Sequence, residues 1–427
     1  MPDLTRCPIP YGDASVSFDV PSANLMGVYA PHDVAPLPDL DAALSEALSH
    51  PIGGPSLEDM VRGARSVLLV VDDNTRPTPT DRLLPPLLDR LNAAGIPDEA
   101  IELLIALGTH RPMTWEECEQ KFGLEVMRRI AVRNHDAFCA EQLVALGVTP
   151  GGVHVTVNRA VMDADCVIGV GSIVPHHIPG YSGGAKIIQP GVCGEHTTGE
   201  VHLLSTRHEQ SLLGQTENVV RHEMEAIADQ AGLNAILNTV LDAAGEVVGL
   251  VFGEPRQAFR RGAALSKSVY GVDLPTLADI VVAGSHPCDI EFWQAHKTLY
   301  AGARCLRTGG TLIVVTPCPE GLSVTHPDIV EYAGDSPEAI EAGIASGAIH
   351  DLTAGALALA WANVRGQVRI SLVSDGIDDE TARAIGFRPF PDVQTALDAA
   401  LAEQEALARV AVLPYAPDAL PLVEQAE

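Results

Sequence analysis

The sequence lacks the features of a membrane, secreted or nucleic-acid-binding protein. No apolar run approaches the roughly 18 residues needed to cross a bilayer, and residues 1–6 have no apolar core of a signal peptide. Basic residues are scarce, because 27 Lys and Arg stand against 56 Asp and Glu, giving a net charge of −29. Such a charge opposes attraction to nucleic acid and to anionic lipid. We therefore expect a cytoplasmic protein with neither as a partner.

Several common site motifs are also missing. The eight cysteines include no C-x-x-C pair, which argues against a disulfide framework and against a thiolate metal site. No H-E-x-x-H is present, and no G-x-G-x-x-G follows the early strands. Most cysteines are therefore expected to be small buried side chains, with Cys193 kept as a candidate because it lies near the motif described below.

The chain alternates predicted strands with predicted helices, as α/β proteins do. Its 427 residues, 46% of them hydrophobic, are enough for two domains. Buried-type strands are predicted at 66–71, 101–107 and 166–170, with an amphipathic helix at 81–94 between the first two. Further strands are predicted at 280–283, 311–315 and 368–373. This pattern predicts two α/β domains with largely parallel sheets and an active-site cleft between them.

The predicted domains divide near residue 274. Residues 1–273 would form an N-terminal domain that binds cofactor and carries catalysis, and residues 274–409 a C-terminal α/β domain that contributes substrate-binding residues. The apolar run at 410–413 fits either sheet, so the tail 410–427 could rejoin the first domain.

Polar residues follow each of the first three predicted strands, at 72–77, 108–112 and 171–186. In open parallel sheets, ligands bind beyond the carboxyl ends of the strands. We therefore expect these three segments to meet at one edge of the first sheet.

The segment 175–186 places a lysine after a Gly-rich turn. It nearly matches a P-loop, but Ala185 and Ile187 stand where that motif requires Gly and Ser or Thr, which disfavours an NTPase. The remaining turn of Ser182, Gly183 and Gly184 offers backbone N–H groups that suit a phosphate. A tight turn that happens to carry Lys186 explains the fragment equally well.

Histidines accompany this turn. Imidazoles at 176, 177 and 202 suit Zn, Ni, Cu or Fe, although no short ligand spacing supports a metal. His110 follows a buried strand on a Gly-Thr-His loop, a good position for general acid/base catalysis.

Two cationic side chains complete the set of candidates. Arg76 offers a fork for a carboxylate, or else pairs with Asp72 or Asp73 to hold its own loop. Gln294 and Lys297 share one face of a predicted helix.

Together these segments resemble the lactate racemase family. The resemblance rests on D-N-T-R-P at 73–77, A-L-G-T-H-R at 106–111, P-H-H-I-P-G-Y-S-G-G-A-K at 175–186, His202, and Q-A-H-K at 294–297. Five separated motifs in the same order are far more specific than any one of them.

The resemblance implies a nickel-pincer nucleotide, a pyridinium-3-thioamide-5-thiocarboxylic acid mononucleotide that holds nickel. By that likeness, Lys186 attaches the cofactor covalently beside the turn 182–184, and His202 is a nickel ligand. His110 and His176 would be the acid/base pair. The substrate would contact Arg76, Lys297, Gln294, Asp73 and Trp293, the last of these as a size filter.

The implied reaction is inversion at C2 of a 2-hydroxy acid by transient hydride transfer to the cofactor, through a keto acid. Lactate or a larger 2-hydroxy acid would be the substrate, and cofactor-biosynthesis enzymes the partners. Two alternatives stay open: a nicotinamide-dependent 2-hydroxy acid dehydrogenase, and a non-catalytic carrier of nickel or nucleotide. The carrier has no need for His110, His176, Arg76 and Lys297 together.

Overall fold

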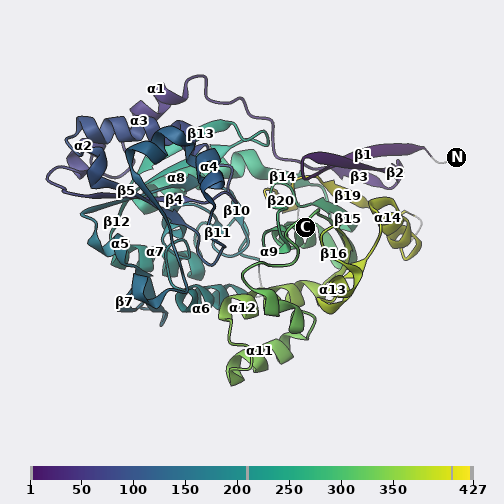
Figure 1. Cartoon of the computed structure of the whole chain (residues 1–427). Helices are drawn as coiled ribbons and strands as arrows, with labels where there is room; N and C mark the ends of the chain where they lie inside the picture. The colour runs from purple at the N-terminus through teal and green to yellow at the C-terminus, as the bar shows by residue number, and fades with distance from the viewer. Residues whose placement is uncertain (1–2, 208–210, 405–406, 424–427) are drawn as a thin grey trace.

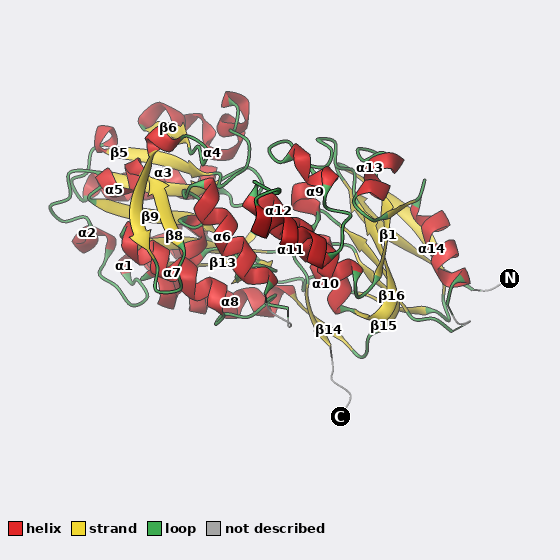
Figure 2. Ribbon diagram, turned by 90° about the horizontal axis from the view of Figure 1, so that it is seen from below, coloured by secondary structure: helices red, strands yellow, loops and turns green. Residues whose placement is uncertain are grey.

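The computed structural model describes residues 3–207, 211–404 and 407–423, and it has two six-stranded sheets side by side (Figure 1). Helices lie over the faces of both sheets (Figure 2). The prediction of a two-sheet, largely parallel α/β fold is confirmed. Among the described residues, no helix combines the length and apolarity needed to cross a membrane.

The first sheet has the strand order β13-β12-β9-β4-β5-β6 and is parallel except for β13, which pairs antiparallel with β12. Its strands are β4 (Val67–Asp72), β5 (Ile101–Ala106), β6 (Ala131–Asn134), β9 (Cys166–Ser172), β12 (Leu233–Leu241) and β13 (Val247–Gly253). All residues of β4 are buried, which explains why its sequence is an uninterrupted apolar run.

Helices cover both faces of this sheet. They are α1 (Leu40–Ser49), α2 (Leu57–Met60), α3 (Thr80–Ala93), α4 (Trp115–Arg129), α5 (Arg159–Asp163), α6 (Glu195–Thr206), α7 (Val219–Ala231) and α8 (Pro255–Tyr270). Alternate residues of β4 enter two different cores: Leu69 packs with α1, α3 and α4, and Leu68 packs with α6 and α7. Helix α4 begins with a capping box, since Thr114 and Glu117 each bond to the other's backbone N–H.

The second sheet is parallel throughout and has the order β18-β17-β16-β15-β19-β3. Its strands are β3 (Leu25–Val28), β15 (Ala278–Gly284), β16 (Leu306–Val315), β17 (Arg369–Val373), β18 (Arg388–Pro389) and β19 (Val410–Leu413). The helices of this part are α9 (Phe292–Ala295), α10 (Lys297–Arg304), α11 (Pro337–Ser346), α12 (Leu352–Arg365), α13 (Asp379–Ala384) and α14 (Val393–Ala402).

Both ends of the chain meet this second sheet. The antiparallel hairpin of β1 (Leu4–Tyr11) and β2 (Ala14–Pro21) packs against it, sharing a core with α14. The first strands therefore lie with the second sheet, although the predicted domain 1–273 groups them with the first. The run at 410–413 forms β19 in the second sheet, and β20 (Leu420–Val423) pairs with β14 (Gly271–Leu274). Residues 1–2 and 424–427 lie outside the described residues, and the boundary near 274 stays a prediction.

Two small hairpins are formed by segments of the first part, and a helix contact joins that part to the second. β7 (Leu143–Val148) and β8 (His154–Asn158) form an antiparallel hairpin, as do β10 (Pro175–His176) and β11 (Gly180–Tyr181). Helix α6 packs on α12, with Gly199 lying so close to Leu352 that a side chain at 199 would overlap it. This contact sets a helix of the first part directly against one of the second.

Candidate active site

The three polar segments that follow β4, β5 and β9 converge on one cavity, as the parallel topology predicts. The cavity has about 880 Å³ of empty space, including the open solvent at its mouth. The second part of the chain closes it with residues of α9, α10 and α12. Every predicted site residue except Gly184 lines the cavity: Asp73, Arg76, His110, His176, Ser182, Gly183, Lys186, His202, Trp293, Gln294 and Lys297.

His110 sits in a hydrogen-bonded chain that crosses the cavity. Its Nδ1 lies 2.6 Å from Asp73 Oδ2, and its Nε2 lies 2.9 Å from Gln294 Nε2. Lys297 Nζ donates to Gln294 Oε1 at 2.6 Å, which orients the amide so that its N–H points to His110. The network therefore assigns the ring hydrogen to Nδ1 and a lone pair to Nε2. This is the form of a general base.

Asp73 is charged in this chain. Burial raises the pKa of its carboxyl, but the facing His110 and the nearby Arg76 outweigh that effect and hold the pKa below its usual range. The carboxylate also accepts a hydrogen bond from the backbone N–H of Thr75 at 3.1 Å. The negative charge of Asp73, beside His110 Nδ1, stabilises the imidazolium that forms when Nε2 takes up a proton.

The loop that carries Asp73 and Arg76 is held from beneath by Lys121 of α4. The Lys121 ammonium lies 3.1 Å from Asp72 Oδ1 and donates to the carbonyls of Arg76 and Thr78 at 2.6 and 3.0 Å. Arg76 Nη1 donates to the carbonyl and hydroxyl of Thr75. The carboxylate of Asp72 therefore pairs with Lys121. Arg76 lines the cavity.

His176 projects from the β10–β11 hairpin and is buried. Its Nδ1 accepts from the backbone N–H of Ile178 at 3.2 Å, so in the neutral ring Nε2 carries the hydrogen. Burial and the charge of Lys186 keep the pKa of His176 well below its usual value. His176 stacks on His177, which in turn stacks on Tyr300 with ring centroids 3.8 Å apart. The stack fixes the plane of the His176 ring.

The Gly-rich turn positions Lys186 rather than presenting a row of free N–H groups. The N–H of Ser182 donates to the carbonyl of Val174 at 2.8 Å, and that of Gly184 to Asn238 Oδ1 at 2.8 Å. The Ser182 hydroxyl donates to the carbonyl of Ser172 at 2.8 Å. Gly183 has a φ of +72° and lies against Ile173, where a side chain would clash. Lys186 follows on a single 3-10 turn, Gly184–Ile187.

Two buried groups beneath this turn complete its support. Arg221 of α7 donates to the carbonyls of Tyr181 and Gly183, and its guanidinium lies 3.9 Å over the Phe259 ring. Asn238 is buried on β12. The turn is therefore anchored from a neighbouring strand and a helix.

Lys186 has the environment of a nucleophilic amine. Burial, and after it the charges of Arg76 and Lys297, keep the pKa of Lys186 well below its ordinary value. A lowered pKa favours the uncharged amine, which is the form that can bond covalently to an acyl group.

His202 of α6 has one ring nitrogen available. Its Nδ1–H donates to the carbonyl of Thr198, one helical turn earlier, at 2.7 Å. This bond leaves the lone pair on Nε2, the arrangement found in metal-binding histidines. Burial and the charge of Lys186 lower the pKa of His202 to about 4, so the ring is neutral, as a ligand must be. The chemistry of His202, with Lys186 in the same cavity, therefore fits a metal-containing group.

The α9–α10 segment forms the cavity wall that comes from the second part of the chain. Lys297 lies 3.6 Å from Cys288 Sγ, and burial together with Arg76 lowers the pKa of Lys297 to about 8. Trp293 is 5% exposed and stacks on His326 with centroids 4.0 Å apart. His326 Nε2 lies 3.0 Å from the Thr109 hydroxyl, which links this wall to the loop after β5.

The cysteines take no part in the cavity's hydrogen-bond chain beyond the Lys297–Cys288 contact. All eight are free, and all but Cys139 are buried. Burial raises the pKa of Cys193, so its thiol stays protonated and unreactive.

Sequence reasoning missed several residues that hold this site. Lys121, Arg221, Asn238 and His326 each fix a loop or a wall of it. Asn238 had a usable signal, because it interrupts the apolar strand L-N-A-I-L-N-T-V-L. The sequence gives no such signal for Lys121 and Arg221, because a basic residue on a helix ordinarily faces solvent.

Comparisons with known proteins lead to the same family as the sequence motifs. Residues 11–214 match the family model of the lactate racemase N-terminal domain. The chain is 29% identical over 324 residues to a lactate racemase of Thermoanaerobacterium thermosaccharolyticum, covering 74% of this chain and 76% of that protein. It is 31% identical over 285 residues to a lactate racemase of Lactiplantibacillus plantarum, covering 65% of this chain and 66% of that one.

Two solved structures share the fold. The lactate racemase apoprotein from T. thermosaccharolyticum superposes with a TM-score of 0.88 and 25% identity, over 98% of this chain and 100% of that chain. A crystal structure of a protein from Thermotoga maritima has a TM-score of 0.72 and 21% identity, over 92% of this chain and 100% of that chain. The second likeness concerns the fold alone.

Proposed function

The chain belongs to the lactate racemase family of isomerases, and on that basis we propose that it inverts C2 of a small 2-hydroxy acid through a keto acid. The proposed cofactor is a nickel-pincer nucleotide attached at Lys186 with His202 as nickel ligand. The observation that carries the proposal is one cavity that holds a lysine with a lowered pKa, an imidazole with a free Nε2 and a hydrogen-bonded base.

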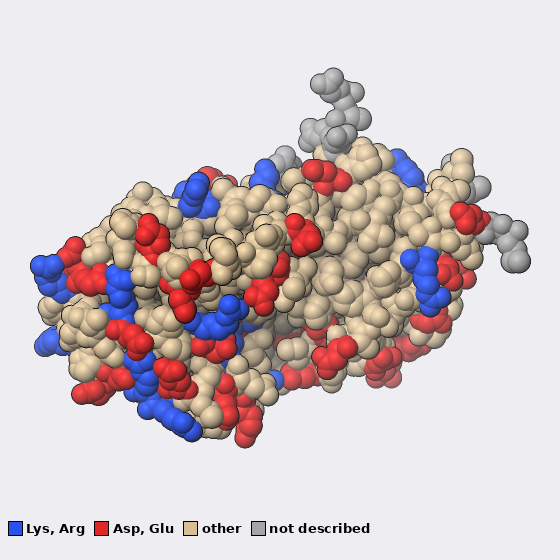
Figure 3. Space-filling view, turned by 90° about the horizontal axis from the view of Figure 1, so that it is seen from above, with Lys and Arg blue, Asp and Glu red and all other residues tan. Residues whose placement is uncertain are grey.

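Substrate binding follows from the placement of cations. The protein as a whole is strongly acidic, with a net charge of −29 (Figure 3). On the face shown there, Asp and Glu are spread along the molecule, whereas Lys and Arg gather mainly toward the end that holds the first sheet. Arg76 and Lys297 concentrate positive charge inside the cavity, which suits a carboxylate. Gln294 and Asp73 support them.

Two residues of the chain would hold the cofactor. Lys186 would form the thioamide link, and His202 Nε2 would complete the coordination of nickel. When bound, this group supplies a hydride acceptor and donor beside C2.

The histidines would move the protons. As the substrate is oxidised, its hydroxyl proton passes to His110 Nε2, and Asp73 stabilises the resulting imidazolium. The C2 hydrogen leaves with its electron pair, which gives a neutral ketone instead of a carbanion next to a carboxylate. The keto acid then presents its other face, and His176 serves as the proton donor to the oxygen as the hydrogen returns to C2. Arg76 and Lys297 hold the carboxylate throughout.

The open alternatives explain less of the site. A nucleotide or nickel carrier needs Lys186 and His202, but not the chain from Asp73 through His110 and Gln294 to Lys297. A nicotinamide-dependent dehydrogenase needs a dinucleotide site, and no G-x-G-x-x-G follows the early strands. The cytoplasmic location and the cofactor-biosynthesis partners stay predictions.

The test is to produce the protein together with cofactor-making enzymes and nickel. Intact mass spectrometry should show an adduct, and peptide mapping should locate it at Lys186. A panel of 2-hydroxy acids, beginning with lactate and extending to larger acids, is then read by chiral chromatography. An unmodified Lys186 contradicts the cofactor assignment, and an adduct without turnover of any acid favours the carrier.

A further inference from the structure

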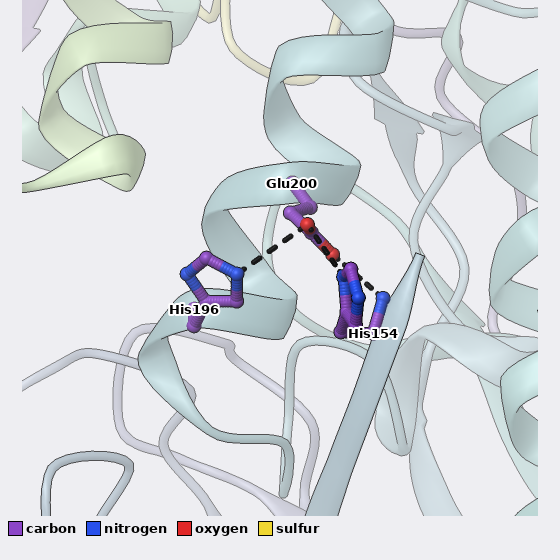
Figure 4. A group of neighbouring side chains, drawn as sticks. All are labelled: His154, His196 and Glu200. Atoms are coloured by element: carbon purple, nitrogen blue, oxygen red, sulfur yellow. Dashed lines mark hydrogen bonds and ion pairs between the residues drawn. The ribbon is translucent and has the colours of Figure 1, made fainter. Parts of the chain in front are cut away.

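A second group of metal-binding side chains lies outside the cavity, on the outer side of α6. His196 and Glu200 stand one turn apart on this helix, and His154 reaches them from the start of β8 (Figure 4). One candidate ligand atom from each residue lies within 4.8 Å of the other two. The proposed function makes no use of these three residues.

The carboxylate of Glu200 is already aimed between the two rings. One oxygen, Oε2, accepts the backbone N–H of His154 at 2.7 Å. The other, Oε1, lies 3.0 Å from His154 Nδ1 and 3.3 Å from His196 Nε2. The backbone therefore fixes one end of the carboxylate, while the second oxygen is shared by both imidazoles.

The backbone beneath these side chains is also fixed. Thr197 Oγ1 donates to the carbonyl of His154 at 2.8 Å and accepts the N–H of Thr156 at 2.9 Å. The N–H of Gly194 donates to the carbonyl of Thr156 at 3.1 Å. These bonds hold β8 against the first turn of α6, so the three side chains can be brought to an ion by rotamer adjustments alone.

We propose that His154, His196 and Glu200 bind a divalent transition-metal ion such as Zn²⁺. Two imidazole nitrogens and one carboxylate oxygen are a donor set that suits this ion, with water in the remaining coordination positions. The His154 and His196 side chains are 66% and 61% exposed, so an ion can enter directly from solvent. Without an ion, the same contacts are exposed ion pairs that contribute little to stability.

A bound ion would join the β7–β8 hairpin to α6. Glu200 lies two residues before His202, which faces the cavity from the buried side of the same helix. Binding only to the folded chain raises the melting temperature by mass action. We expect Zn²⁺ to raise the melting temperature of this protein, and the rise to disappear when a ligand is removed.

The experiment uses full-length protein made without the cofactor-making enzymes, stripped with a chelator and titrated with Zn²⁺ by calorimetry. Wild type should bind one ion at this site. Glu200→Gln and His196→Gln should each weaken that binding by at least about tenfold, because loss of outer-shell partners alone costs about that much. The matched control is His222→Gln, since His222 on α7 forms an exposed pair with Glu217 at 3.0 Å. His202→Gln tests whether Zn²⁺ binds in the cavity instead of at the surface site.

Each outcome decides the proposal. Weakened binding in the Glu200 and His196 variants, with binding unchanged in His222→Gln and His202→Gln, supports it. Equal binding in Glu200→Gln and wild type overturns it, as does loss of binding only in His202→Gln or no binding at all. Melting curves without Zn²⁺ check that the variants fold as wild type does.

Discussion

The two walls of the cavity differ in what they contribute. The wall from the first sheet holds the three histidines and the lysine of the site. Hydrogen bonds define the tautomers of His110, His176 and His202. Burial lowers the pKa of Lys186. The wall from the second part of the chain holds a cation, an amide and an aromatic ring on the short α9–α10 segment. The difference suggests that the first wall carries chemistry and attachment while the second carries substrate positioning. Substitutions in the two walls should therefore have different kinetic signatures.

The largest effect is expected at Lys186. Lys186→Ala removes the only group proposed to form a covalent link, so adduct and turnover should both be lost. The sequence contains four lysines, at 121, 186, 267 and 297, which makes mapping of the adduct unambiguous. Lys267→Ala, at an exposed position near the end of α8, is the control and should keep both adduct and activity. A full adduct on Lys186→Ala protein would show that attachment lies elsewhere.

The next effect concerns the base on the same wall. His110→Ala should lower kcat by roughly 10²- to 10⁴-fold, the usual contribution of a general acid/base, while the Lys186 adduct remains. Steady-state kinetics and intact mass spectrometry measure the two quantities on one sample. His222→Ala serves as the control histidine. An unchanged kcat would remove His110 from the proposed proton transfer.

The second wall should behave differently. Lys297→Met removes a charged hydrogen-bond donor worth about 1.5–3 kcal/mol, so kcat/KM should fall by about 10- to 150-fold, mainly through KM. The adduct should form normally, because Lys297 is not needed to attach it. A loss of kcat with no change in KM would contradict the proposal that this wall positions the substrate.

The lowered pKa of Lys297 predicts that kcat/KM depends on pH. The charged form of Lys297 is present below its pKa of about 8 and is lost as pH rises through that value. A carboxylate needs the charged form, so kcat/KM, which reports the free enzyme, should decline above about pH 8. Lys297→Arg keeps its charge and should flatten this decline. An identical profile in the variant would assign the decline to another group.

The smallest effect is expected at Trp293. Trp293→Phe keeps an aromatic ring in the stack on His326 while freeing space in the cavity. We expect the preference between lactate and a larger 2-hydroxy acid to shift by about tenfold toward the larger one, within the range that packing differences give. Competition between the two acids, followed by chiral chromatography, measures the shift. No shift would place the size filter elsewhere.

Local patterns were sufficient to predict the parts of the fold and site that depend on short segments. The buried runs of β4, β5 and β9 were readable because parallel strands covered on both faces are apolar throughout. Their shared edge follows from topology, which is why Asp73, His110 and Lys186 could be expected in one place. The capping box of α4 was equally local.

Long-range packing accounts for what the sequence did not reveal. The pairing of β3 with β19 and the docking of the N-terminal hairpin on the second sheet join residues almost 400 positions apart. Arg221 and Lys121 appear as ordinary surface residues until the fold brings backbone carbonyls to them. The tautomers of His110 and His202 likewise depend on partners that only the folded chain supplies.

The most direct measurement of the central claim is turnover of the loaded enzyme in D₂O. Lactate, or whichever acid of the panel is the best substrate, is converted from one enantiomer, and the product enantiomer is separated and examined by NMR at C2. If hydrogen moves as hydride between the substrate and the group at Lys186, the product keeps its original hydrogen at C2. Deuterium at C2 of the product would mean that the proton exchanges with solvent, and it would contradict the proposed mechanism.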